Sequence, residues 1–181
     1  MRSSFFFLLF FLCKLASGQD TGSMHQQFAE VYLVKDTSVK LIIYNQVDGT
    51  AIDTLLNSAD KYCWYLLEIK NSVDGWFQIQ HIAHIPGCDS DSLQFDDLSI
   101  QNYWVKAENF MVDTQGYHEV TFYSLKNSTA DIVFQTSNFF HCNVLEANGG
   151  WLKVSLIIDD EEIVGWLGPG DYCAFPWTTC P

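Results

Sequence analysis

The same spacing of aromatic and cysteine residues occurs twice in this chain, and this repeat restricts the possible folds more than any other feature. Tyr44 precedes Cys63 by 19 residues, and Tyr123 precedes Cys142 by the same 19 residues. With no gap in that stretch, Thr50-Ala51 aligns with Thr129-Ala130. The repeat predicts two copies of one unit, each of about 70 residues.

The tryptophans extend this alignment toward the C-terminus. Trp76 corresponds to Trp151 after a four-residue deletion in the second copy, and Trp104 corresponds to Trp166 after loss of most of residues 83 to 101. The sequence Asp-Thr-Gln-Gly at 113–116 interrupts the strand pattern between the copies. We therefore expect one unit over residues 30–113, with a long insert in its distal hairpin, and a second over 117–181.

Apolar residues recur with a period of two rather than with the period of a helix. Val39, Leu41 and Ile43 alternate with their neighbours, and similar runs follow Asp48-Gly49 and the turn at 71–75. No segment carries a capped apolar stripe over three helical turns. The chain is predicted to be all-β, as two small barrels, with Leu152, Val154 and Leu156 on the core face of one strand.

The first 18 residues have the features of a cleaved signal peptide. Arg2 precedes a short apolar run over 5–12, and Ala16-Ser17-Gly18 supplies small residues for cleavage. Residues 19–29 are polar and predict a flexible leader, so the mature protein is expected to be secreted or periplasmic with no integral membrane span. Lipidation at Cys13 is the alternative, although the bulky Leu12 fits it poorly.

The mature chain is strongly acidic. After removal of residues 1–18 it keeps seven lysines, no arginine and all 22 carboxylates. Without arginine there is no bidentate phosphate clamp, and the surplus negative charge repels polyanions. Nucleic acid and anionic lipid are therefore disfavoured as partners, whereas a cationic ligand or a basic protein is compatible with the charge.

Five cysteines remain after processing, so at least one is unpaired or bonded to another chain. Proximity in the sequence favours a disulfide between Cys173 and Cys180, which closes a C-terminal tail, and a second between Cys63 and Cys88 leaves Cys142 free. Pairing of Cys142 with Cys173 is a rival. Export permits such disulfides, but spacing alone does not determine their connectivity.

The sequence Gly-Trp-Leu-Lys-Val at 150–154, followed by Gly-Trp-Leu at 165–167 and a terminal aromatic, resembles the bacterial SH3 (SH3b) family. The family's early Asn-Val-Arg-x-Gly-Pro strand is absent from both copies. The resemblance implies a ligand groove lined by aromatic residues and proline. Carried over position by position, the groove residues are Trp151, Pro169, Tyr172 and Tyr123 in the second unit, and Trp76, Phe110 and Tyr44 in the first.

Two roles remain open for these aromatic residues: they line a groove for a ligand, or they pack between the two units. The resemblance implies a non-catalytic protein that recognises a peptide, a peptidoglycan fragment or a protein partner. The alternative function is an acidic immunity or inhibitor protein that blocks a basic toxin or hydrolase. An enzyme built on Cys142 ranks third, because His141 directly precedes it and adjacent strand residues point apart.

No cofactor is predicted. His81, His84 and Cys88 lie close together in the sequence, but the two histidines fall on opposite faces of an extended strand. Asp89, Asp91, Asp96 and Asp97 lack the ligand spacing of an EF-hand loop. The carboxylates are therefore interpreted as a solvated acidic loop, the Cys88 thiol is assigned to a disulfide, and neither group is predicted to bind a metal.

Overall fold

The computed structural model describes residues 28–57, 59, 63–84 and 102–174. These residues form thirteen β-strands and no helix, as the two-residue period predicts. The first seven strands are β1 (Ala29–Leu33), β2 (Lys40–Tyr44), β3 (Ala51–Leu56), β4 (Tyr65–Val73), β5 (Trp76–His84), β6 (Tyr103–Lys106) and β7 (Phe110–Thr114). The other six are β8 (Val120–Tyr123), β9 (Ile132–Thr136), β10 (His141–Asn148), β11 (Trp151–Ile158), β12 (Glu161–Leu167) and β13 (Tyr172–Cys173).

Alternation of apolar and polar residues explains the faces of the strands. In β11, Leu152, Val154 and Leu156 are buried, which confirms the predicted core face, whereas Trp151 is only half-buried. Tight turns separate the strands where the backbone needs positive φ. Asp74 and Gly75 join β4 to β5 with φ of 46° and 78°, a conformation that favours glycine and is tolerated by Asp.

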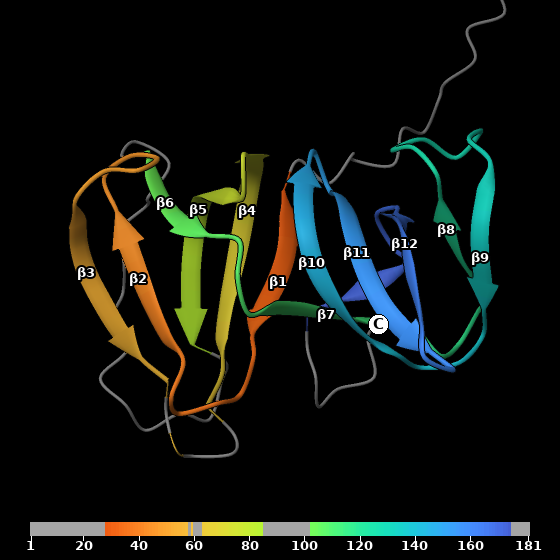
Figure 1. Cartoon of the computed structure of the whole chain (residues 1–181), viewed down its shortest axis with the longest axis horizontal. Coiled ribbons are helices and arrows are strands. Elements are labelled where there is room, and N and C mark those ends of the chain that lie inside the picture. Colours follow the sequence, from red (N-terminus) through yellow and green to blue (C-terminus); the bar gives the residue numbers. More distant parts are fainter. Residues whose placement is uncertain (1–27, 58, 60–62, 85–101, 175–181) are drawn as a thin grey trace, which may run out of the picture.

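All thirteen strands belong to one sheet that includes a small closed barrel. The order is β3-β2-β6-β5-β4-β1-β7-β10-β11-β12-β8-β9, with β13 beside β7. An additional pairing of β10 with β4, at Asn148 and Asn71, closes the strands β4, β1, β7 and β10 into a ring. Figure 1 shows β2–β6 at one end of the elongated molecule, β8, β9, β11 and β12 at the other, and β1, β7 and β10 between them.

Strand β7 connects the two ends. Phe110 and Met111 pair with β1, whereas Met111 to Asp113 pair with β10 and Asp113 and Thr114 pair with β13. The strand therefore continues through Asp113 and Thr114, where the sequence pattern predicted an interruption over 113–116, and it is shared by both halves. One continuous core cluster also spans them, from Phe77 and Phe110 to Phe122 and Leu152.

The two halves repeat one pairing pattern. The hairpin of β2 and β3 joins β6 through Tyr44 and Trp104, and the hairpin of β8 and β9 joins β12 through Tyr123 and Trp166. In each hairpin the register shifts immediately before the tyrosine. Residues that the sequence alignment treats as equivalent thus make equivalent strand pairs.

Several sequence predictions fall outside the described residues: the signal peptide over 1–18, most of the leader over 19–29, Cys88, Cys180 and the insert carboxylates. Strand β1 begins at Ala29, one residue before the predicted start of the first unit. Cys142 is a free, buried thiol. Cys63 and Cys173 are half-cystines, and because Cys88 and Cys180 are not described, those two pairings stay predictions. No helix in the described part of the chain is long and apolar enough to cross a membrane.

Candidate functional site

The first candidate site is the aromatic pair of Trp151 and Tyr123 in the C-terminal half. Trp151 opens β11 after Gly149 and Gly150, whose φ values of 56° and 80° make the turn, and Tyr123 ends β8. Their ring centroids lie 6.0 Å apart at 69°, an edge-to-face contact. The tryptophan is half-buried, so part of its ring is accessible to a partner.

The turn after β12 bounds the other side of the Trp151 ring. A Cβ atom added at Gly168 would lie 3.3 Å from Cη2 of Trp151, so the ring packs directly against this glycine. Pro169, the next residue, is exposed. The structure therefore brings Tyr123 and Trp151 into contact, and Pro169 is the exposed residue that follows the glycine packed on the Trp151 ring.

Tyr172 is placed differently. It is buried, and its hydroxyl donates to the carbonyl oxygen of Gly150 at 2.8 Å. Burial raises the pKa of this phenol further above its usual range. Its side chain thus fixes the backbone that precedes Trp151 instead of presenting a ring at the surface.

The equivalent residues of the N-terminal half form a more closed arrangement. Tyr44 and Trp76 make an edge-to-face contact with centroids 4.9 Å apart, and Nζ of Lys106 lies 6.0 Å from the centroid of Trp76. These neighbours leave Trp76 only 6% exposed. Phe110, the third predicted residue here, is also buried and packs against Phe77.

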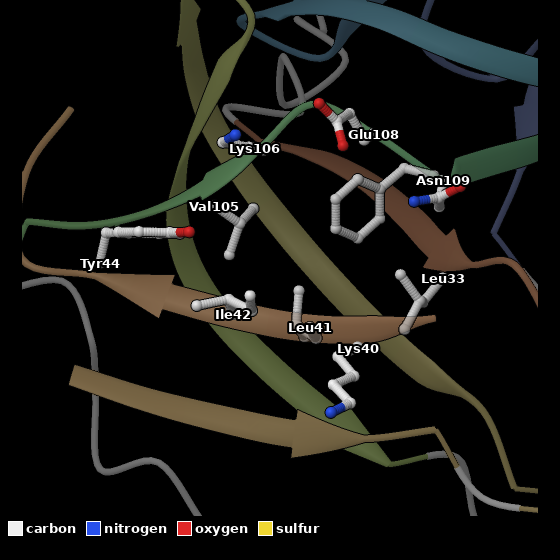
Figure 2. Close-up of a pocket in the computed structure, with 10 residues that line it drawn as sticks. Leu33, Lys40, Leu41, Ile42, Tyr44, Val105, Lys106, Glu108 and Asn109 are labelled. Carbon is white, nitrogen blue, oxygen red and sulfur yellow. The ribbon is translucent and has the colours of Figure 1, made fainter. Parts of the chain in front are cut away.

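A small pocket of about 80 Å³ adjoins this second aromatic pair. Tyr44 and Phe110 both line it, together with Leu33, Leu41 and Val105. Figure 2 shows Tyr44 at one end of β2 with its hydroxyl pointing toward Val105, and Lys40 at the other end, with Leu41 between them. The volume suits a methyl group or a few waters, so this pocket is smaller than an ordinary ligand site.

The structure also contains a cluster that sequence reasoning missed. The carboxylate of Asp113 on β7 is fully buried, and its Oδ1 accepts a hydrogen bond from the Tyr32 hydroxyl at 2.7 Å. Nδ1 of His141 lies 2.6 Å from the same oxygen. Oδ2 is buried and has no hydrogen-bond partner within the described residues. Burial raises the pKa of Asp113, and the hydrogen bonds from Tyr32 and His141 oppose this only in part.

A pocket of about 290 Å³ lies beside this cluster. We call it the junction pocket; its lining residues are Tyr32, Val34, Lys35, Trp64, Met111 and His141. Tyr32 and Trp64 meet edge to face with centroids 5.4 Å apart, and Nζ of Lys35 lies 5.6 Å from the Trp64 centroid and donates to the Cys63 carbonyl oxygen. Strands β1, β7 and β10 thus bring residues of both halves to one concave surface.

Cys142 follows His141 in the chain and is a free, buried thiol. It is fully buried, and burial together with the charge of Asp113 raises the pKa of the thiol to about 12. Its Sγ lies 3.9 Å from the Phe140 carbonyl oxygen. Burial thus disfavours the thiolate form of Cys142 at neutral pH.

Comparisons with known proteins add little to this geometry. No protein-family model and no curated protein matches the sequence. Among solved structures, NlpC2 from Trichomonas vaginalis is similar at 12% identity and a TM-score of 0.32, over 81% of this chain and 48% of that one. NlpC1 from the same organism is similar at 14% identity and 0.33, over 83% and 47%. The chain thus spans about half the length of these proteins, and at such TM-scores the likeness supports no inference about function.

Proposed function

We propose that this chain is an exported, non-catalytic binding protein built from two SH3-like units. It recognises a peptide, a peptidoglycan fragment or a protein through aromatic residues. The observation that carries the proposal is the edge-to-face Tyr–Trp pair, which recurs in the two halves as Tyr44 with Trp76 and Tyr123 with Trp151. Each tyrosine also pairs with a second equivalent tryptophan across the strands, Trp104 or Trp166.

The C-terminal pair is the better contact surface of the two. Trp151 keeps part of its ring accessible beside the exposed Pro169, whereas Trp76 is almost fully covered by Tyr44 and Lys106. A rigid, partly exposed tryptophan provides a large contact area with little loss of conformational entropy on binding. We therefore assign recognition to Tyr123, Trp151 and Pro169.

The first test compares binding of residues 19–181 to purified bacterial cell-wall sacculi before and after Trp151→Ala. We expect the substitution to weaken binding at least about ten-fold, as for a central interface aromatic, with little change in Tm. Tyr117→Ala is the matched control, because Tyr117 is 65% exposed and belongs to neither pair. A large loss of Tm with unchanged binding assigns Trp151 to packing and contradicts the proposal.

The alternative, an acidic inhibitor of a basic hydrolase, is distinguished with lysozyme as the probe. Tight binding that weakens steeply with salt and survives Trp151→Ala supports inhibition through the acidic surface. Binding to sacculi that depends on Trp151 and responds little to salt supports aromatic recognition.

A further inference from the structure

The junction pocket combines apolar walls with groups that complement an anion. Tyr32, Trp64, Val34 and Met111 supply the apolar surface, and Lys35 and His141 supply nitrogen donors. None of these six residues is acidic, although the chain has 22 carboxylates and only nine basic side chains. The lining thus supplies hydrogen-bond donors and no acidic side chain, while the buried Asp113 carboxylate adjoins it through its contacts with Tyr32 and His141.

The buried carboxylate determines how His141 faces a ligand. When Asp113 is ionised its Oδ1 only accepts, so Nδ1 of His141 carries the proton in the 2.6 Å contact. In the imidazolium form, Nε2 is then a second donor that this hydrogen bond does not use. The His141 side chain is 59% exposed, whereas that of Asp113 is 1% exposed, so the histidine is the member of the pair that a ligand can reach.

The size of the pocket limits what enters. About 290 Å³ accommodates one large amino-acid side chain with its carboxylate, and it lies at the lower end of the range for small-molecule sites. The two aromatic rings, held edge to face, offer a preorganised wall for an apolar group. If the ligand also carries a carboxylate next to its apolar group, that carboxylate can form charge-assisted hydrogen bonds with His141 and Lys35.

We propose that the junction pocket is a second binding site, which takes an apolar group carrying a carboxylate, such as the free C-terminal residue of a peptide. Its apolar group packs on Tyr32 and Trp64, and its carboxylate accepts from Nε2 of His141 and pairs with Lys35. This site is separate from the Trp151 surface, and its existence does not depend on the function proposed for that surface.

The test is an NMR titration of residues 19–181, at mildly acidic pH, with N-acetylphenylalanine and with its neutral primary amide. For the carboxylate we expect a Kd of about 1 mM, typical of a ligand of this size, with shifts at the Trp64 indole and His141 ring. The amide is expected to bind at least about ten-fold more weakly, because it cannot form the charge-assisted hydrogen bonds.

Two variants and a matched control test whether the carboxylate binds at the junction pocket. His141→Gln and Lys35→Met should each reduce affinity for the carboxylate several-fold and leave the amide unchanged. His118→Gln is the control, because His118 is also exposed and contacts an aspartate, Asp171, at 3.4 Å, but does not line the pocket. Equal affinity for acid and amide, absence of saturation, or shifts confined to Trp151 and Tyr123 overturns the proposal.

Discussion

At the scale of single residues, Asp113 is the most unusual group in the described part of the chain. Its carboxylate is fully buried, one oxygen receives both hydrogen bonds and the other receives none. A buried charge with an unsatisfied oxygen costs free energy, and such groups concentrate at functional sites. The same residue therefore positions His141 at the junction pocket and weakens the fold that holds it.

The raised pKa of Asp113 predicts a specific pH dependence of stability. Because the folded-state pKa lies above that of the unfolded chain, the stabilising contribution is complete below about pH 4, the unfolded value, and is lost as pH rises through the folded pKa. Asparagine does not titrate. The free energy of unfolding of Asp113→Asn relative to the wild type should therefore increase as pH rises from about 4 to 7.

Urea unfolding at a series of pH values measures this difference. Asp131→Asn, at an exposed position, removes the same charge and serves as the control for general repulsion among the carboxylates. The prediction fails if the two variants differ from the wild type by the same amount at every pH, or if Asp113→Asn loses relative stability toward neutral pH.

At the scale of elements, the contact between β4 and β10 closes the barrel with few interactions. Asn71 pairs with Asn148, and beside them the Ser72 hydroxyl donates to the Ala147 carbonyl oxygen at 3.0 Å and accepts from the Ala147 amide at 2.9 Å. One side chain thus replaces two strand hydrogen bonds at the place where the N-terminal and C-terminal halves meet. Because Ala147 is fully buried, water cannot readily replace the two hydrogen bonds that Ser72 makes with its backbone.

Ser72→Ala should therefore destabilise the protein by about 1–3 kcal/mol, the usual cost of leaving buried backbone groups unpaired. The loss is expected as a lower urea midpoint, together with faster hydrogen exchange of the Ala147 amide. Ser137→Ala, at an exposed position, is the control and should change the midpoint little. Unchanged hydrogen exchange of the Ala147 amide in the Ser72→Ala variant contradicts this account of the contact between β4 and β10.

At the scale of the whole molecule, the features that the sequence predicted are those that depend on local patterns. The two-residue period predicted an all-β chain and the buried face of β11, whereas the ligand groove that the resemblance implies stays a prediction. The Asp113 cluster was not predicted, because its members lie 28 to 109 residues apart and meet only through the pairing of β7 with β1 and β10. The available signal was Asp113 itself, an aspartate at the end of an apolar run, but the segment 113–116 was interpreted as an interruption between two units.

The shared strand β7 also predicts how the molecule unfolds. Two domains unfold in separate transitions when few contacts connect them. Here β7 pairs with β1 of the first half and with β10 and β13 of the second half. The core cluster is continuous through Phe110, Val112 and Cys142. Removal of either half exposes this core and leaves β7 without some of its partner strands.

We therefore expect residues 19–181 to unfold in one calorimetric transition, with equal calorimetric and van't Hoff enthalpies, despite the internal repeat. A fragment that ends at residue 116, after the predicted boundary, should lack a cooperative transition of its own, because the edge of β7 that pairs with β10 and the apolar side of Val112 become exposed. Two resolved transitions in the intact chain, or a cooperatively folded fragment, indicates independent units. In that case the two repeats are domains that unfold independently although both pair with β7.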